Sequence, residues 1–95
     1  MASGQGNATL DFGAFPGANE ASVTFSDATI GAASSVESYV MASDTTADHT
    51  AADHRYFAAL VGLTSSANAG VGGTIYARST EKLQGTFKVR YVWAD

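Results

Sequence analysis

Two Asp-His pairs lie close together near the middle of the chain, in the segment Asp48-His49-Thr50-Ala51-Ala52-Asp53-His54. Imidazole nitrogens and carboxylate oxygens suit zinc and other divalent ions, so His49, Asp53 and His54 are the candidate metal ligands. On a helix His49 and Asp53 would share a face, but His49 and His54 would diverge by more than a right angle. The sequence has no further histidine and no His-Glu-x-x-His spacing. We therefore expect a structural role for the segment, with an aspartate capping a turn, and we predict no metal and no cofactor.

Catalytic motifs are missing from the rest of the sequence. Serines are abundant, but none stands in a Gly-x-Ser-x-Gly motif. Gly70-Val71-Gly72-Gly73 lacks the following Lys-Ser/Thr of a phosphate-binding loop and is better explained as a hairpin or loop hinge. Glu20, Glu37 and Glu81 are expected at exposed strand positions, with no aromatic residues arranged around them to hold a sugar. We predict that the protein is not an enzyme.

The amino-acid composition excludes several further classes of protein. A chain of 95 residues forms one domain, and 45% hydrophobic against 15% charged residues argues against disorder. The absence of cysteine excludes disulfides and thiolate metal sites, and a net charge of -4 argues against nucleic-acid binding. The N-terminus lacks the basic and apolar regions of a secretory signal, and no apolar stretch approaches the roughly 20 residues that cross a bilayer. We therefore expect synthesis in the cytoplasm and no membrane partner.

Charge is unevenly distributed along the chain. Residues 1–54 carry seven carboxylates and no Lys or Arg, whereas residues 55–95 carry five basic and two acidic residues. In one interpretation the two halves form facing sheets whose charges pair within one molecule. In the other, the acidic side of one copy meets the basic side of the next, which makes Lys88, Arg90 and Arg78 candidate interface residues.

The dominant sequence period is two, which is typical of half-buried strands. Ala21, Val23 and Phe25 alternate with hydroxyl residues, and at the C-terminus Phe87, Val89, Tyr91 and Trp93 alternate with Thr86, Lys88, Arg90 and Val92. Further strands are predicted at residues 7–12, 36–41 and 73–79. In the strand at 36–41, Glu37, Tyr39 and Met41 share a face. Tyr91 and Trp93 are predicted to lie in the core.

Turn-forming residues recur at short intervals along the sequence. This spacing favours an all-β fold, namely an antiparallel β-sandwich of the jelly-roll or Ig-like kind. One helical turn fits within residues 46–56, capped by Asp48 or Asp53. Residues 57–63 are apolar on both faces and predict a central strand, although a short helix fits nearly as well. The expected organisation is a flexible N-terminal arm at residues 1–6 followed by a single sandwich domain at 7–95.

A domain of this size buries only about 60–65% of its unfolded surface and has marginal stability alone. Without disulfides or a metal, self-association is the usual remedy, so we expect a homo-oligomer, most simply a trimer.

Three parts of the chain resemble a family of small proteins found among the structural genes of tailed bacteriophages and prophages. These are Asn19-Glu20-Ala21-Ser22-Val23-Thr24, residues 47–54, and residues 74–77 together with 83–94. The resemblance spans about residues 7–95 and implies a place in the virion after synthesis in the host bacterial cytoplasm. It implies no catalytic residue.

The leading hypothesis is therefore a capsid decoration or cement protein that binds the assembled shell in many copies. The alternative is a tail or fibre module that binds host-surface glycans through loops such as 45–55 and 65–73. A small metal-dependent enzyme built on His49 and His54 ranks last.

Overall fold

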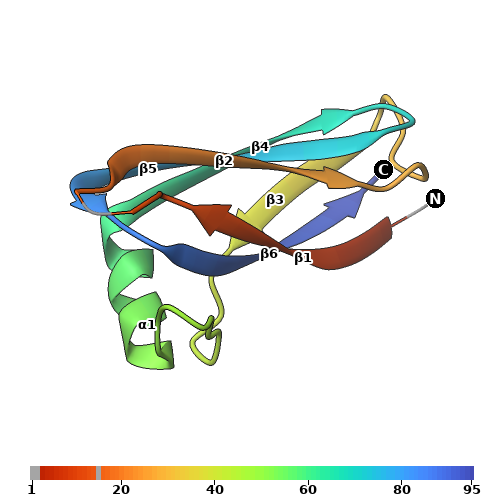
Figure 1. Cartoon of the computed structure of the whole chain (residues 1–95). Helices are drawn as coiled ribbons and strands as arrows, with labels where there is room; N and C mark the ends of the chain where they lie inside the picture. The colour runs from red at the N-terminus through yellow and green to blue at the C-terminus, as the bar shows by residue number, and fades with distance from the viewer. Residues whose placement is uncertain (1–2, 15) are drawn as a thin grey trace.

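Six strands and one helix make up the part of the chain that the computed structural model describes, residues 3–14 and 16–95 (Figure 1). Their order is β1 (Ser3–Asp11), β2 (Ala18–Ser26), β3 (Ser35–Tyr39), α1 (Ala51–Leu60), β4 (Val61–Asn68), β5 (Gly72–Leu83) and β6 (Thr86–Ala94). Sheet A has the order β1-β6-β3 and sheet B the order β2-β5-β4, with all neighbouring strands antiparallel. The two sheets pack face to face and α1 lies at one end of them (Figure 1). The predicted antiparallel β-sandwich is confirmed.

The central strand of sheet A supplies much of the core. Along β6 the side chains of Phe87, Val89, Tyr91 and Trp93 are all buried, as their alternation predicted. Phe25 of β2 reaches across from sheet B and stacks on Tyr91, with ring centroids 3.7 Å apart. Because a one-residue slip would bury charged residues in place of these rings, the register of β6 is firmly set.

The first strand begins earlier than the sequence predicted. Residues 3–6, expected to belong to a flexible arm, are part of β1 and pair with the C-terminal half of β6. Gly4 and Gly6 face the inside, where a Cβ on either would overlap the ring of Trp93 or Tyr91. These glycines therefore make room for large aromatic side chains. Residues 1 and 2 of the predicted arm lie outside the described residues.

The helix also differs from its prediction. It runs from Ala51 to Leu60, so the apolar run at 57–63 is split between α1 and β4 and is not one central strand. Thr50 is the N-cap: its hydroxyl accepts a hydrogen bond from the Asp53 N–H, and the Asp53 carboxylate accepts one from the Thr50 N–H. This capping box fixes the start of the helix ahead of the apolar run. Among the described residues, no helix is long and apolar enough to cross a membrane.

The acidic and basic halves of the chain do not form one sheet each. β5 and β6, both from the basic half, are the central strands of the two sheets. Charges nevertheless pair between the halves within one molecule, in Glu20–Arg78 at 2.8 Å and Asp44–Arg90 at 3.2 Å.

Candidate functional site

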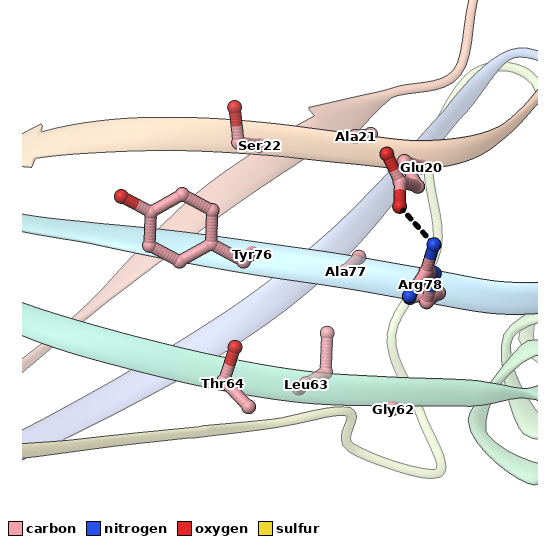
Figure 2. Close-up of a pocket in the computed structure, with 9 residues that line it drawn as sticks. All are labelled: Glu20, Ala21, Ser22, Gly62, Leu63, Thr64, Tyr76, Ala77 and Arg78. Atoms are coloured by element: carbon pink, nitrogen blue, oxygen red, sulfur yellow. Dashed lines mark ion pairs between the residues drawn. The ribbon is translucent and has the colours of Figure 1, made fainter.

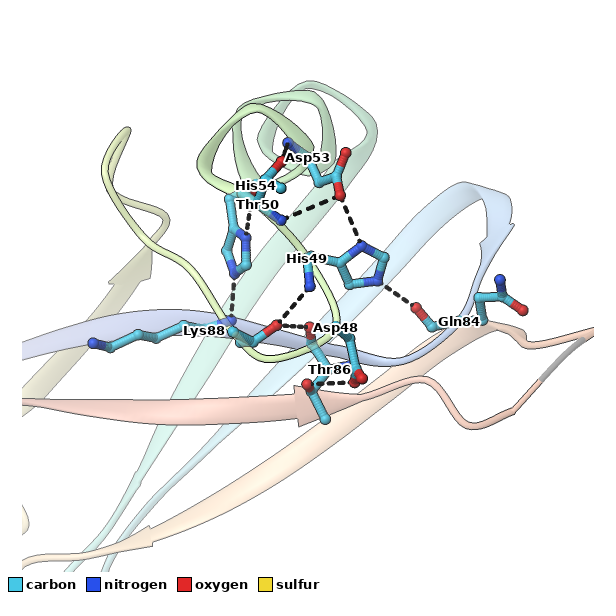
Figure 3. Close-up of polar contacts among 9 residues, drawn as sticks. Asp48, His49, Thr50, Asp53, His54, Gln84, Thr86 and Lys88 are labelled. Atoms are coloured by element: carbon cyan, nitrogen blue, oxygen red, sulfur yellow. Dashed lines mark hydrogen bonds and ion pairs between the residues drawn. The ribbon is translucent and has the colours of Figure 1, made fainter.

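One edge of β6 is completed by side chains in place of a strand. β3 ends opposite Arg90, so residues 86–89 of β6 have no strand partner on that side. The segment 44–54 lies along this stretch and bonds to β6 through its polar side chains (Figure 3). Unpaired backbone groups at a sheet edge are costly when they are shielded from water. The two Asp-His pairs belong to this segment.

His54 is fully buried and uses both ring nitrogens. Its Nε2 accepts the Lys88 N–H at 2.9 Å, and its Nδ1 lies 2.9 Å from the Thr50 carbonyl oxygen. Because the first contact needs an acceptor and the second a donor, the ring is the neutral imidazole with its proton on Nδ1. His54 therefore joins the start of α1 to β6 and has no nitrogen free for a metal.

His49 lies nearer the surface and faces two acceptors. Its Nε2 is 2.7 Å from the Gln84 carbonyl oxygen and its Nδ1 is 3.3 Å from the Asp53 carboxylate, while the ring stacks on Phe87. Both contacts are satisfied together when the ring carries two protons. Hydrogen bonds from the Thr50 N–H and then from His49 hold the pKa of Asp53 below its usual value.

Asp48 faces the first residue of β6. Its carboxylate accepts hydrogen bonds from the Thr86 hydroxyl at 2.7 Å and the Thr86 N–H at 2.8 Å, and these lower its pKa. The Thr46 hydroxyl donates to the Thr86 carbonyl oxygen at 2.7 Å. Thr86 is thus bonded on both its N–H and its carbonyl by the segment 44–54.

The candidate metal ligands do not converge. The rings of His49 and His54 are 6.5 Å apart and nearly perpendicular, and the nitrogens of His54 face backbone atoms. Within residues 3–14 and 16–95, no group of three His, Cys, Asp or Glu side chains is placed to hold a metal ion. The chemistry this arrangement supports is hydrogen bonding that attaches the segment and α1 to β6.

The predicted interface residues lie on two different faces. Arg78 is on the outward face of sheet B, paired with Glu20, whereas Lys88 and Arg90 belong to sheet A. The Lys88 amine extends away from the histidine cluster (Figure 3). The structure therefore brings Lys88 and Arg90 to one sheet and leaves Arg78 on the other side of the sandwich.

The outward face of sheet A carries two exposed apolar side chains next to Arg90. Tyr39 is 38% exposed and Met41 is 40% exposed, and together with Gln5 and Arg90 they line a groove of about 310 Å³, here called the sheet A groove. The strand predicted at residues 36–41 ends at Tyr39 in the structure, and Met41 lies in the loop that follows β3, so the prediction was wrong at this end. Alternation in the sequence indicates the outward position of Tyr39, whereas the backbone of Met41 is held by its hydrogen bond to Asp44.

Asp44 fixes the geometry of this groove. Its carboxylate is buried, accepts hydrogen bonds from Arg90 Nε and Nη2 at 3.3 and 3.2 Å, and accepts another from the Met41 N–H at 2.9 Å. One carboxylate thus holds both Arg90 and the backbone of Met41 in place.

The outward face of sheet B holds a larger groove of about 580 Å³ (Figure 2), here called the sheet B groove. Its side chains form two rows across the three strands, Glu20-Arg78-Gly62 and Ser22-Tyr76-Thr64. Tyr76 is 50% exposed. The strand predicted at residues 73–79 includes Tyr76, but the sequence did not indicate that Tyr76 lines a groove.

The two loops considered for glycan binding do not meet. Residues 45–55 lead into α1 at one end of the sandwich, whereas 65–73 form the β4–β5 hairpin at the far end of β4 (Figure 1). They cannot contact the same small ligand.

Comparison with family models, with curated proteins and with solved structures finds no match to this chain.

Proposed function

We propose that this chain is a tailed-bacteriophage virion protein, a capsid decoration protein that binds the assembled shell through the sheet A groove and has no enzymatic activity. The sequence resemblance supports the setting. One observation supports the proposed binding surface: Tyr39 and Met41 are exposed beside Arg90 at the outward face of sheet A. Tyr, Met and Arg are enriched at the centres of protein interfaces.

The rigidity of this face favours binding. Arg90 extends from the central strand β6 and is held by the buried Asp44, which also bonds the Met41 backbone. A surface that is already ordered loses less conformational entropy when it meets a partner. The Arg90 side chain remains 34% exposed.

The proposed effect on the particle follows from mass action. A protein that binds assembled shells and not free subunits stabilises the shell in proportion to the logarithm of its free concentration over its dissociation constant. Binding as an oligomer, for which we propose a trimer, would add avidity where shell sites are spaced to match.

Co-sedimentation with undecorated shells of the encoding phage tests the proposal. We expect the wild-type chain to sediment with shells and to raise their temperature of disruption. Met41→Glu replaces an apolar contact with a carboxylate that must lose its hydration when the partner binds, and should weaken binding at least about tenfold, or 1.4 kcal/mol.

Tyr76→Ala is the matched control, because it removes an exposed aromatic from the opposite sheet and should leave shell binding unchanged. A wild-type chain that does not sediment with shells would refute the function. Equal binding by Met41→Glu would refute the assigned face.

A further inference from the structure

The outward face of sheet B presents one aromatic ring among hydroxyl groups. Tyr76 stands on the central strand β5, flanked in register by Ser22 on β2 and Thr64 on β4 (Figure 2). The next outward row of the sheet is Thr24, Thr74 and Ser66. An exposed ring surrounded by small hydroxyl side chains offers a stacking surface with hydrogen-bonding groups around it.

The neighbouring row adds a charge-balanced pair. Arg78 Nη2 and Glu20 Oε1 are 2.8 Å apart, and their side chains are 80% and 63% exposed. Guanidinium and carboxylate groups keep further donors and acceptors available after one contact is made. Because their charges cancel, this row favours a neutral polar ligand over an acidic or basic one.

Gly62 leaves open space next to Arg78, in the row beside that of Tyr76. A Cβ built at this position would meet nothing closer than the Arg78 carbonyl oxygen at 3.9 Å. The resulting groove, about 580 Å³, falls within the range of about 300–1,000 Å³ typical of small-molecule sites. It crosses three strands, or roughly 10 Å at ordinary strand spacing.

We propose that the sheet B groove binds a neutral oligosaccharide, with a sugar ring stacked on Tyr76 and its hydroxyl groups bonded to Arg78 and Glu20. A pyranose ring has an apolar C–H face and a hydroxyl edge, which match the aromatic ring and the polar row beside it. Nucleic acid would require a basic groove, and this one carries a balanced pair. The site goes beyond shell binding, because it faces away from sheet A.

Titration of the ¹⁵N-labelled chain tests the proposal, with cellohexaose, maltohexaose and mannohexaose as neutral probes and a hexamer of galacturonic acid as the acidic control. We expect at least one neutral probe to shift the amides of Ser22, Gly62 and Tyr76 saturably, with the acidic hexamer bound more weakly. The absence of saturable shifts at about 10 mM of every neutral probe would overturn the proposal, because a dissociation constant above this range corresponds to little specific binding. Shifts confined to sheet A, or equal binding of the acidic hexamer, would also overturn it.

Two variants locate the site. Tyr76→Ala should weaken binding about tenfold or more, the loss expected when a stacking ring is removed. Gly62→Val fills the open space with a residue that suits a strand, keeps Tyr76 intact and should cause a similar loss. Tyr39→Ala, on the outward face of sheet A, is the matched control and should leave sugar binding within about twofold of wild type.

Failure of this proposal is distinguishable from failure of the proposed function. Tyr76→Ala should lose sugar binding and keep shell binding, whereas Met41→Glu should do the reverse. Unchanged sugar binding by both Tyr76→Ala and Gly62→Val would overturn the sheet B site whatever the result with shells.

Discussion

His54 illustrates how one buried polar side chain can replace a missing strand. Its ring accepts the Lys88 N–H where β3 has already ended, and its other nitrogen donates to the Thr50 carbonyl. A backbone N–H without such an acceptor would incur the full cost of its lost hydration. One of the three candidate metal ligands in the sequence is thus bonded to the backbone instead.

Replacing His54 with alanine should therefore destabilise the protein strongly. The change leaves a cavity at a fully buried position and removes the acceptor of Lys88, so we expect a loss of about 3 kcal/mol in the free energy of unfolding. Urea denaturation followed by circular dichroism measures it. His49→Ala is the control, because that ring is partly exposed, and should cost about 1 kcal/mol. Equal losses would show that His54 does not have this role.

At the scale of the element, β1 depends on having no side chain at two inward positions. Gly6→Ala would place a methyl group against the Tyr91 phenol, whose ring is already stacked on Phe25. We expect a loss of about 2 kcal/mol from this overpacking, measured by thermal or urea unfolding. Gly31→Ala is the control, since a Cβ there meets no atom within 4 Å, and should stay within about 0.5 kcal/mol of wild type. A neutral Gly6→Ala would mean that this part of β1 does not pack on Tyr91.

The same strand shows where prediction from sequence stops. Alternation identified the buried faces of β2 and β6 because each strand has an apolar and a polar side. The inward residues Gly4 and Gly6 carry no hydrophobic signal, so the start of β1 looked like a flexible arm. Its pairing with β6 joins Ser3 to Ala94, a contact that no local pattern encodes.

The helix and the candidate site were predictable to different degrees. Residues 57–63 favoured a strand over a short helix only slightly, and the capping box of Thr50 and Asp53 decided where the helix begins. Alternation in the sequence indicated the outward position of Tyr39, but its place beside Arg90 depends on the pairing of β3 with β6, and Met41 lies in the loop beyond that strand. The role of Asp44 could not be predicted, because it joins a loop to a strand 46 residues away.

At the scale of the whole molecule, Asp27 and Asp48 join β6 to distant segments and Asp53 caps α1, and acid should loosen these contacts together. The pKa values of these carboxyls are lowered: in Asp27 by the Thr29 hydroxyl and N–H and then Trp93, in Asp48 by Thr86, and in Asp53 by the Thr50 N–H and then His49. A pKa that is lower in the folded than in the unfolded state adds stability that is present above the ordinary value of 3.8 and is lost as the pH falls towards the folded value. We expect the melting temperature to fall as the pH is lowered through about 4 and below.

Asp48→Asn separates this effect from general acid unfolding. The amide oxygen can still accept from Thr86 but does not titrate in this range, so the variant should be less stable than wild type at neutral pH and lose less stability below pH about 4. Melting curves of both proteins across the acid range measure the difference. Parallel curves would show that Asp48 does not contribute to acid sensitivity.

The small size of the molecule predicts that it self-associates. The chain is 95 residues long and has no cysteine, so it cannot form the disulfides that support many small domains. We therefore expect light scattering to give three times the 9.7 kDa mass of the chain at micromolar concentration, with dissociation on dilution accompanied by a lower melting temperature. A monomer with a melting temperature independent of concentration would contradict this prediction, because the sandwich would then be stable through its own core alone.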